Sequence, residues 1–154
     1  MKRDDVVEMV KMLLKKYGVS GKYIEIEITE SLLLDNAEKV IERLNSLKAL
    51  EIKISIDDFT AGHSTAGLLS ILPVDIVKFD RSLILGFNDN EEKGKKIYKG
   101  LIKMIKSLEL KIVAEGIETQ SELNFLKDNE VDYAQGFLLG RPVKESEFFK
   151  TNSI

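Results

Sequence analysis

At 154 residues, 44% of them hydrophobic and 32% charged, the chain is long enough and apolar enough to fold as one domain with its own core. Its net charge of −3 favours neither nucleic acid nor an anionic membrane as a partner, the absence of cysteine excludes disulfides, and the single histidine, His63, excludes a multi-histidine zinc site within one chain. No apolar run approaches the ~18 residues of a membrane span and the first residues lack a signal-peptide pattern, so we expect a cytoplasmic protein without a membrane segment.

Short strands and helices alternate along the whole chain. Strands are indicated by apolar residues at every second position, and helices by apolar residues three or four positions apart. Repeated strand–helix units of this kind predict an α/β fold with a parallel sheet and right-handed crossovers. In chain order we expect a helix over 6–17, a strand over 23–29, a helix over 37–50, a strand over 52–57, a short helix over 64–72, a strand over 75–80, a helix over about 90–108, a strand over 111–115, a helix over 119–129, a strand over 131–137 and a weak helix over 144–149.

Apolar stripes indicate which side of three helices should face the core. Local signals also mark helix ends: Gly18 is expected to end the first helix, and Thr119 with Glu122 has the spacing of a capping box. The stripes are Val6, Val10, Leu13, Leu14 and Tyr17 in the first helix, Val40, Ile41, Leu44 and Leu47 in the second, and Ile97, Leu101, Ile105 and Leu108 in the long one.

Two fold classes have this rhythm: a doubly wound open sheet and a TIM-type barrel. Strands that are covered by helices on both faces read as nearly continuous apolar runs. Here the strands are two-faced; in 52–57, three isoleucines alternate with Lys53, Ser55 and Asp57. A TIM-type barrel explains a polar face better, because its active sites gather at the carboxyl ends of the strands. We therefore expect a partial TIM-type (β/α) barrel of about five parallel strands with alternating helices.

Carboxylates gather where the predicted strands end. If the strands lie side by side, Glu27, the pair Asp57 and Asp58, and Glu115 converge, and like charges at such close range repel. Mg²⁺ or Mn²⁺ would relieve this repulsion, and adjacent aspartates can flank two ions. Two ions suit in-line attack of water on a phosphodiester, and Lys78 is placed to orient that water or to offset charge on the phosphate.

Each of these residues also has a plainer interpretation. Asp57 and Asp58 fit an Asx turn or a helix cap. Glu27 and Lys78 fit solvated positions on a strand, and Glu118 fits the favourable end of a helix dipole. The metal site is favoured because the residues occur together, at matching strand ends and with matching parity.

Five segments carry these residues in order: EITES (27–31), IDDFTAGHST (56–65), LPVDIVKFDRS (72–82), VAEGIET (113–119) and DYAQGFLLGRP (132–142). Together they resemble the successive signatures of EAL domains, bacterial phosphodiesterases that open the second messenger cyclic di-GMP to the linear dinucleotide pGpG. The resemblance runs from about residue 5 to residue 149. It implies a TIM-type barrel, a site with two Mg²⁺ or Mn²⁺ ions, and cyclic di-GMP as the substrate.

The resemblance implies a role for each matching residue of the cluster. Glu27 resembles a metal ligand, Asp57 the aspartate shared by two metals, and Asp58 a ligand of the second metal. Lys78 resembles the catalytic lysine that positions the attacking water. Glu115 resembles the catalytic glutamate near the metals, proposed as a base or a water ligand.

Three further residues match the family, and several features depart from it. Gln135 resembles the glutamine that binds substrate, while Glu30 and Glu118 resemble glutamates that anchor loops. No E-A-L triplet occurs in the chain, and no strand with an asparagine ligand precedes the first predicted strand. Thr60 and His63 stand where the family loop has glycine and tyrosine, and threonine lacks the conformational freedom of glycine.

These departures predict an incomplete site. We expect residues 1–154 to form a single, N-terminally truncated EAL-like domain that is inactive or weakly active alone, because two strands with metal ligands are missing. Five strands cannot close a barrel of this type, so the sheet would keep two open edges. We therefore expect the chain to self-associate or to belong to a larger multidomain protein.

Three functions fit the sequence. The first is a metal-dependent phosphodiesterase that acts on cyclic di-GMP. The second is a non-catalytic EAL-like module that binds cyclic di-GMP or a protein partner, and turnover separates it from the first. The third is an unrelated magnesium-dependent barrel, which a preference for a non-nucleotide phosphate ester would indicate.

Overall fold

A computed structural model describes residues 6–29, 37–59, 67, 69–85 and 91–151. Strands and helices alternate along them, as the sequence predicts. None of the helices in these ranges is long and apolar enough to cross a membrane. The elements in chain order are α1 (Val6–Tyr17), the 3₁₀ helix η2 (Gly21–Tyr23), β1 (Glu25–Thr29), α2 (Ala37–Lys48), β2 (Lys53–Asp57), β3 (Ile76–Phe79), α4 (Arg81–Leu85), α5 (Glu91–Ser107), β4 (Lys111–Ala114), α6 (Gln120–Asp128), β5 (Tyr133–Ala134) and α7 (Glu145–Thr151).

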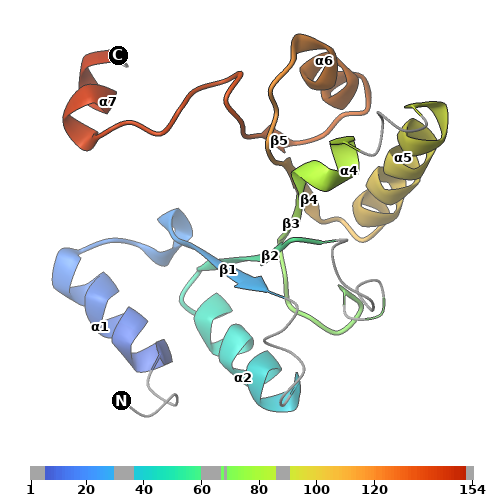
Figure 1. The fold of residues 1–154 in the computed structure, drawn as a ribbon. Coiled ribbons are helices and arrows are strands. Elements are labelled where there is room, and N and C mark those ends of the chain that lie inside the picture. The colour runs from blue at the N-terminus through green and yellow to red at the C-terminus, as the bar shows by residue number, and fades with distance from the viewer. Residues whose placement is uncertain (1–5, 30–36, 60–66, 68, 86–90, 152–154) are drawn as a thin grey trace.

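The five strands form one parallel sheet in the order β1-β2-β3-β4-β5, so neighbours in sequence are neighbours in space. The register places Ile28 beside Ile56, Ile56 beside Val77, and Val77 beside Ile112. Among the described residues β1 and β5 do not pair with each other, so the sheet is not closed. Figure 1 shows the helices around the outside of the strands, with α1 and α7 on the open side. The predicted partial TIM-type arrangement of five parallel strands is confirmed.

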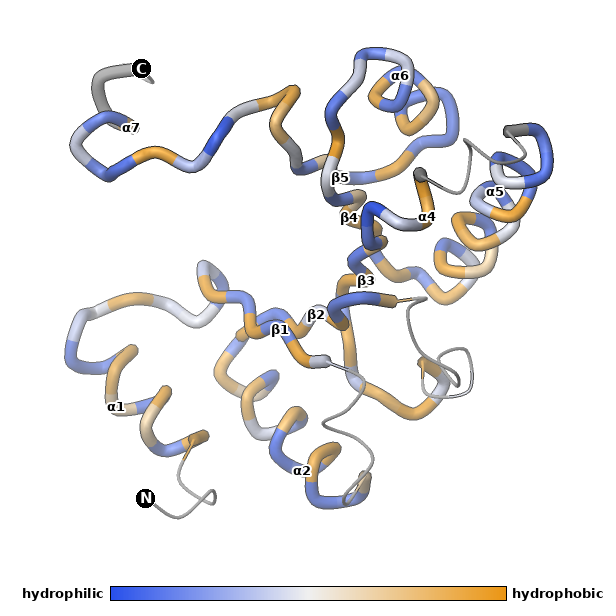
Figure 2. Tube along the Cα trace, in the orientation of Figure 1, coloured by the Kyte–Doolittle hydropathy of each residue, from blue (hydrophilic) through white to orange (hydrophobic). Residues whose placement is uncertain are grey.

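The hydrophobic core lies between the sheet and its helices. The apolar strand face is fully buried at Ile54, Ile56, Val77, Phe79 and Ile112. These side chains form one cluster with residues of α2, α5 and α6. Burial of each such side chain stabilises the fold by about 2 kcal/mol relative to exposure. Figure 2 shows apolar and polar residues alternating along α1, α2 and α5, as expected of helices with one face on a core.

Aromatic rings connect β3 to α5 and α6. Phe79 meets Tyr98 edge to face, with ring centroids 5.2 Å apart, and Tyr98 meets Phe125 in the same way at 5.6 Å. Phe59 stacks against Phe79 at 6.1 Å. Offset and edge-to-face pairs of this kind add to the free energy of burial. They fix the rotation of α5 about its own axis.

The predicted stripe of α5 was wrong at two of its four positions for this reason. Ile97 and Leu108 are exposed, whereas Tyr98 and Ile102 are buried beside Ile105. Neighbouring residues differ by about 100° in direction around a helix axis. The sequence of α5 therefore fits two overlapping apolar stripes, one that includes Ile97 and one that includes Tyr98. The contact of Tyr98 with the strand aromatics selects the second stripe.

The predicted stripe of α1 was right at two of its five positions. Val10 and Leu14 pack against the core, whereas Val6, Leu13 and Tyr17 are exposed. α1 lies beyond the edge strand β1 and packs against α2. An end position gives the helix few neighbours, so Val6, Leu13 and Tyr17 stay in contact with solvent.

Other local predictions can be compared directly. The α2 stripe is confirmed, since Val40, Leu44 and Leu47 are buried. The capping box is confirmed too: Thr119 Oγ1 accepts from the Glu122 N–H, and the Glu122 carboxylate accepts from the Thr119 N–H. The strand expected over 131–137 has only the two residues of β5, and α4 was not predicted. Of the helix expected over 64–72, residues 67 and 69 are helical and residues 70–72 are not, while 64–66 and 68 lie outside the described residues.

Two aspartates, each just before a strand, accept a hydrogen bond from the beginning of the preceding strand in the sheet. Asp75 Oδ2 accepts a hydrogen bond from the Ile54 N–H of β2 at 3.0 Å, and Asp132 Oδ2 accepts one from the Ile112 N–H of β4 at 3.1 Å. Each carboxylate also pairs with a lysine, Lys48 for Asp75 and Lys111 for Asp132. The repeated device stabilises the parallel register at the end of the sheet opposite the strand exits.

The Asp132 contact predicts a pH dependence of stability. Burial alone would raise the pKa of Asp132, but its hydrogen bonds from the Lys111 ammonium and the Ile112 N–H outweigh burial and hold the pKa below its usual range. Because the pKa is about 3.9 in the unfolded chain, this stabilisation is complete above roughly pH 5 and is lost as the pH falls toward the lowered value.

Asp132→Asn should therefore lower the free energy of unfolding at neutral pH by about 1 kcal/mol and flatten its decline in acid. Urea unfolding at neutral, weakly acidic and strongly acidic pH measures both effects. Asp128→Asn, which changes an exposed carboxylate at the end of α6, is the matched control. Identical pH profiles for the two variants would contradict the prediction.

Candidate functional site

Three carboxylates meet one lysine on the polar face of the sheet, where β1 to β4 end. Lys78 Nζ lies 2.8 Å from Glu27 Oε1, 2.7 Å from Glu115 Oε1 and 3.5 Å from Asp57 Oδ1. The Lys78 side chain is 9% exposed. The structure thus brings together Glu27, Asp57 and Glu115, as strand parity predicts, with Lys78 at their centre. We call these four residues the Lys78 cluster.

Strand geometry explains why these four residues meet. Side chains alternate between the two faces of a strand, so Glu27, Asp57 and Lys78 point away from the apolar face of β1, β2 and β3. Glu115 directly follows β4, and its N–H donates to the Phe79 carbonyl at 3.0 Å. That bond continues the pairing of β3 with β4 by one residue and keeps the Glu115 side chain beside Lys78.

The carboxylates keep Lys78 charged in a mostly buried position. Burial by itself would lower the pKa of Lys78. Its hydrogen bonds to Glu115 and Glu27, together with the negative charges of Glu115 and Asp57, outweigh burial and raise the pKa well above its ordinary value. Lys78 is therefore a fixed cation throughout the physiological range rather than a proton donor.

The Lys78 cluster has the donor atoms for a hard cation. Three carboxylates face one ammonium, so the cluster carries excess negative charge if all four groups are ionised. Asp57 Oδ1 is buried and accepts no hydrogen bond from the described residues. Oxygen donors of this kind suit Mg²⁺ or Mn²⁺. No three acidic or histidine side chains of the described residues are spaced to hold an ion in this arrangement, and the Lys78 ammonium stands between the carboxylates.

The other predicted site residues that the structure describes form no ion pair with the Lys78 cluster. Asp58 is exposed and has a left-handed backbone, with φ of 52°. Gln135 follows β5; its N–H donates to the Ala114 carbonyl at 2.8 Å, while its side chain is exposed. Glu118 forms an ion pair with Arg81. Glu30 lies outside the described residues.

Arg81 is a residue that sequence reasoning missed. It directly follows Asp80 at the end of β3, and both of its terminal nitrogens donate to the two oxygens of Glu118. The sequence contains one signal for Arg81, which is a charged residue at the end of a strand. It does not indicate that the partner of Arg81 is Glu118, 37 positions away.

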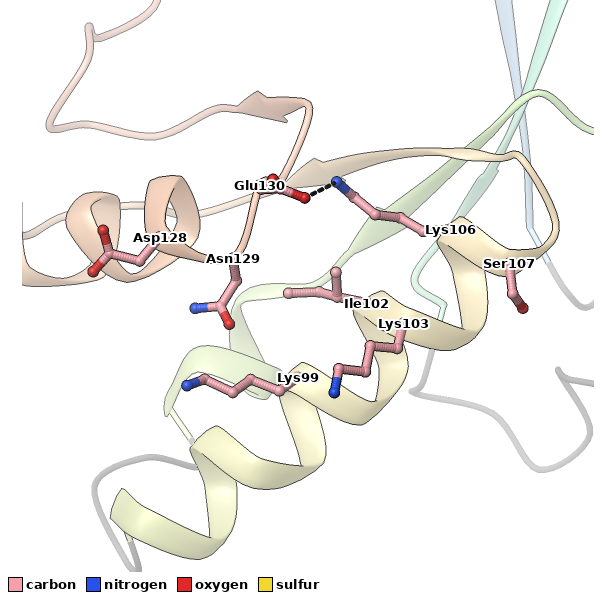
Figure 3. Close-up of a pocket in the computed structure, with 8 residues that line it drawn as sticks. All are labelled: Lys99, Ile102, Lys103, Lys106, Ser107, Asp128, Asn129 and Glu130. Atoms are coloured by element: carbon pink, nitrogen blue, oxygen red, sulfur yellow. Dashed lines mark ion pairs between the residues drawn. The ribbon is translucent and has the colours of Figure 1, made fainter.

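A separate groove lies between α5 and the end of α6 (Figure 3). Its volume is about 500 Å³, and none of its lining residues belongs to the Lys78 cluster. Lys99, Lys103 and Lys106 line it from α5, Asp128 and Glu130 line it from the end of α6 and the residues after it, and Lys106 pairs with Glu130 at 3.6 Å. With charges of both signs on its walls, the groove shows no preference for a ligand, and the Lys78 cluster remains the candidate site.

Removing the central cation tests the electrostatics of the cluster. Lys78→Met leaves three carboxylates facing one another, so the free energy of unfolding at neutral pH should fall by about 2 kcal/mol. Urea unfolding at neutral pH measures this loss.

Lys53→Met is the matched control, because Lys53 is an exposed lysine that lies on the same face of β2 as Asp57. Equal unfolding midpoints for the two variants at neutral pH would contradict the assignment of Lys78 as the charge that holds the carboxylates together.

Comparison with known proteins places the chain in a family. A family model described as EAL domain matches residues 1–142. The cyclic di-GMP phosphodiesterase NbdA of Pseudomonas aeruginosa is 37% identical over 141 residues, which are 92% of this chain and 18% of NbdA. The signaling protein YkoW of Bacillus subtilis is 35% identical over 144 residues, 94% of this chain and 18% of YkoW. The chain therefore spans less than a fifth of either relative.

Solved structures agree with the family match. The EAL domain of Mycobacterium smegmatis DcpA has a TM-score of 0.90 at 33% identity, and the match covers 99% of this chain and 68% of that one. The PaMucR phosphodiesterase in its c-di-GMP complex has a TM-score of 0.85 at 32% identity, covering 96% of this chain and 59% of that one. The matched residues 1–142 include every member of the Lys78 cluster. By its sequence and its fold, the chain belongs to the EAL domain family.

Proposed function

We propose that the chain carries part of a phosphodiesterase site that hydrolyses cyclic di-GMP to linear pGpG in the cytoplasm. The observation that carries the proposal is the Lys78 cluster: a buried lysine among three carboxylates at the exits of parallel strands. TIM-type folds place their chemistry at these exits. The relative NbdA is named for the same reaction, although this chain spans only 18% of its length.

Glu27, Asp57 and Asp58 are the proposed ligands of Mg²⁺ or Mn²⁺. When bound, such ions neutralise charge on a phosphodiester and lower the pKa of water. Asp57 Oδ1 supports this role, because it is buried and accepts no hydrogen bond from the described residues, with the Lys78 ammonium no nearer than 3.5 Å. Gln135 is the proposed contact to the substrate at the exit of β5.

Lys78 and Glu115 are the proposed catalytic residues. The Lys78 ammonium is a fixed positive charge that would orient water and stabilise the negative charge growing on the phosphate oxygens. Glu115, whose Oε1 lies 2.7 Å from Lys78 Nζ, would accept a proton from the attacking water. Glu30 and Glu118 are proposed to hold the loops on either side of the site.

The open sheet suggests that the site is shared. β1 and β5 are both edge strands, and unpaired backbone at a sheet edge favours association. We propose that residues 1–154 act as one domain whose barrel is completed by a second copy or by further polypeptide in a multidomain protein. The chain alone would then turn over slowly or not at all.

A non-catalytic module that binds cyclic di-GMP or a protein partner is the second candidate. One observation favours it: the Lys78 ammonium stands between the carboxylates, and the described residues hold no ready set of three metal ligands. In that case the cluster would be structural, and nucleotide binding would not require a divalent ion.

Hydrolysis of cyclic di-GMP in Mg²⁺ and in Mn²⁺ decides between the two functions. If the retained carboxylates suffice, pGpG appears, and both EDTA and Asp57→Asn reduce the rate by at least about a hundredfold. Asp128→Asn, an exposed carboxylate outside the cluster, should leave the rate unchanged. Nucleotide binding without turnover, unaffected by EDTA, would support the binding module instead.

Association can be tested by sedimentation equilibrium. We expect a mass above the 17.4 kDa of one chain, rising with concentration. Met12→Lys, on the exposed face of α1, should weaken association if that face takes part, whereas Ile71→Lys, an equally drastic change at another exposed apolar residue, should not. A mass of one chain at high concentration would contradict the proposal.

A further inference from the structure

An ion pair connects the exits of β3 and β4 beside the Lys78 cluster. Arg81 begins α4 two residues after the end of β3, and Glu118 lies four residues beyond the end of β4. The two terminal nitrogens of Arg81 each donate to one oxygen of Glu118. A bidentate pair of this kind restricts direction as well as distance, because the guanidinium and the carboxylate are both planar.

The stem of Arg81 also packs against the segment that Glu118 ends. A methyl group added at Gly116 would lie 2.7 Å from Arg81 Cβ and 2.8 Å from its Cγ and Cδ, so the arginine stem occupies the space beside this glycine. Arg81 Nε is buried there and has no hydrogen-bond partner among the described residues. Arg81 thus holds residues 116–118 at both ends, by packing at Gly116 and by charge at Glu118.

This segment determines where the Glu115 carboxylate lies. Gly116 follows Glu115 immediately and has a left-handed backbone, with φ of 69°, which glycine adopts readily. The chain can turn easily at such a residue unless its neighbours are held. The Ile117 N–H donates to the Gln135 carbonyl at 3.0 Å on one side, and Arg81 packs against Gly116 on the other. Glu115 reaches Lys78 from this fixed base, with 2.7 Å between Oε1 and Nζ.

We propose that Arg81 and Glu118 are a positioning pair for Glu115. The pair does not touch the Lys78 cluster by any contact found in the described residues; it acts through Gly116 and the backbone. The inference rests on the proposed function for its effect on catalysis, since Glu115 is the proposed base. Misplacing a catalytic group by about 1 Å can reduce a rate by about a hundredfold.

The alternative is that the pair is an ordinary surface salt bridge, with side chains 39% and 36% exposed. Such pairs contribute little to stability and hold nothing else in place. The pair of Lys111 and Asp132 offers a matched control: it also links the β4 region to a later segment, but at the opposite end of the strand. Breaking either pair should cost similar stability.

The first test needs neither metal nor turnover. A ¹H–¹⁵N correlation spectrum of lysine ammonium groups should show Lys78, because its ammonium is buried and donates to two carboxylates; Lys78→Met assigns the signal. Arg81→Ala and Glu118→Gln should shift or broaden it, while Lys111→Ala should leave it unchanged. Arg81→Lys, which keeps the charge without the bidentate geometry, should restore part of the signal.

Amide hydrogen exchange on the same samples provides a second measurement. The Ile117 N–H should exchange at least about tenfold faster in Glu118→Gln than in the wild type, with the N–H groups of β2 unchanged. Glu118→Gln keeps the shape of the side chain, so this variant still tests the proposal if Arg81→Ala does not fold. An unchanged Lys78 signal together with unchanged exchange at Ile117 would overturn the proposal, as would an equal effect from Lys111→Ala.

The effect on the reaction is a separate measurement. If the chain hydrolyses cyclic di-GMP, Glu118→Gln should lower kcat by about tenfold to a hundredfold and change KM by less than about twofold. If the wild type shows no hydrolysis, the chain alone is inactive, and the spectrum of Lys78 still decides whether Arg81 and Glu118 position Glu115.

Discussion

The buried positive charge of Lys78 is the constraint on which the candidate site depends. Removing an ammonium group from water costs several kcal/mol unless opposite charges and hydrogen bonds replace the water. Lys78 receives them from Glu27, Asp57 and Glu115, which come from three different strand regions. Those contacts require the exits of β1, β2 and β4 to lie at the level of β3. The parallel register and the chemistry of the site are therefore parts of one arrangement.

The same charge balance connects stability to the proposed reaction. Three carboxylates around one lysine neutralise the charge of the lysine and still carry an excess of negative charge. This excess favours the binding of a further cation. The sheet that carries them is open at β1 and at β5. A site made of strand exits is complete only when the strands around it are complete, so the proposed function would link assembly to activity through the sheet edges.

Much of the site was predictable because strand side chains alternate. A period of two determined that Glu27, Asp57 and Lys78 share the face opposite the isoleucines, and repeated strand–helix units determined a parallel sheet in chain order. The position of Glu115 followed from the same parity. Helix ends marked by local chemistry, such as the capping box of Thr119, were equally readable, since they depend on residues only three positions apart.

By itself, then, the sequence determined the order of the elements, the two faces of each strand and which charges share the polar face, because these depend on local periodicity. Tertiary structure alone decided what depends on distant partners. It placed Lys78 between the carboxylates and chose Tyr98 over Ile97 as the core residue of α5 through the contact with Phe79. It also joined Arg81 to Glu118, 37 positions apart, because the distance between two strand exits is set by the packing of the sheet and not by the spacing along the chain.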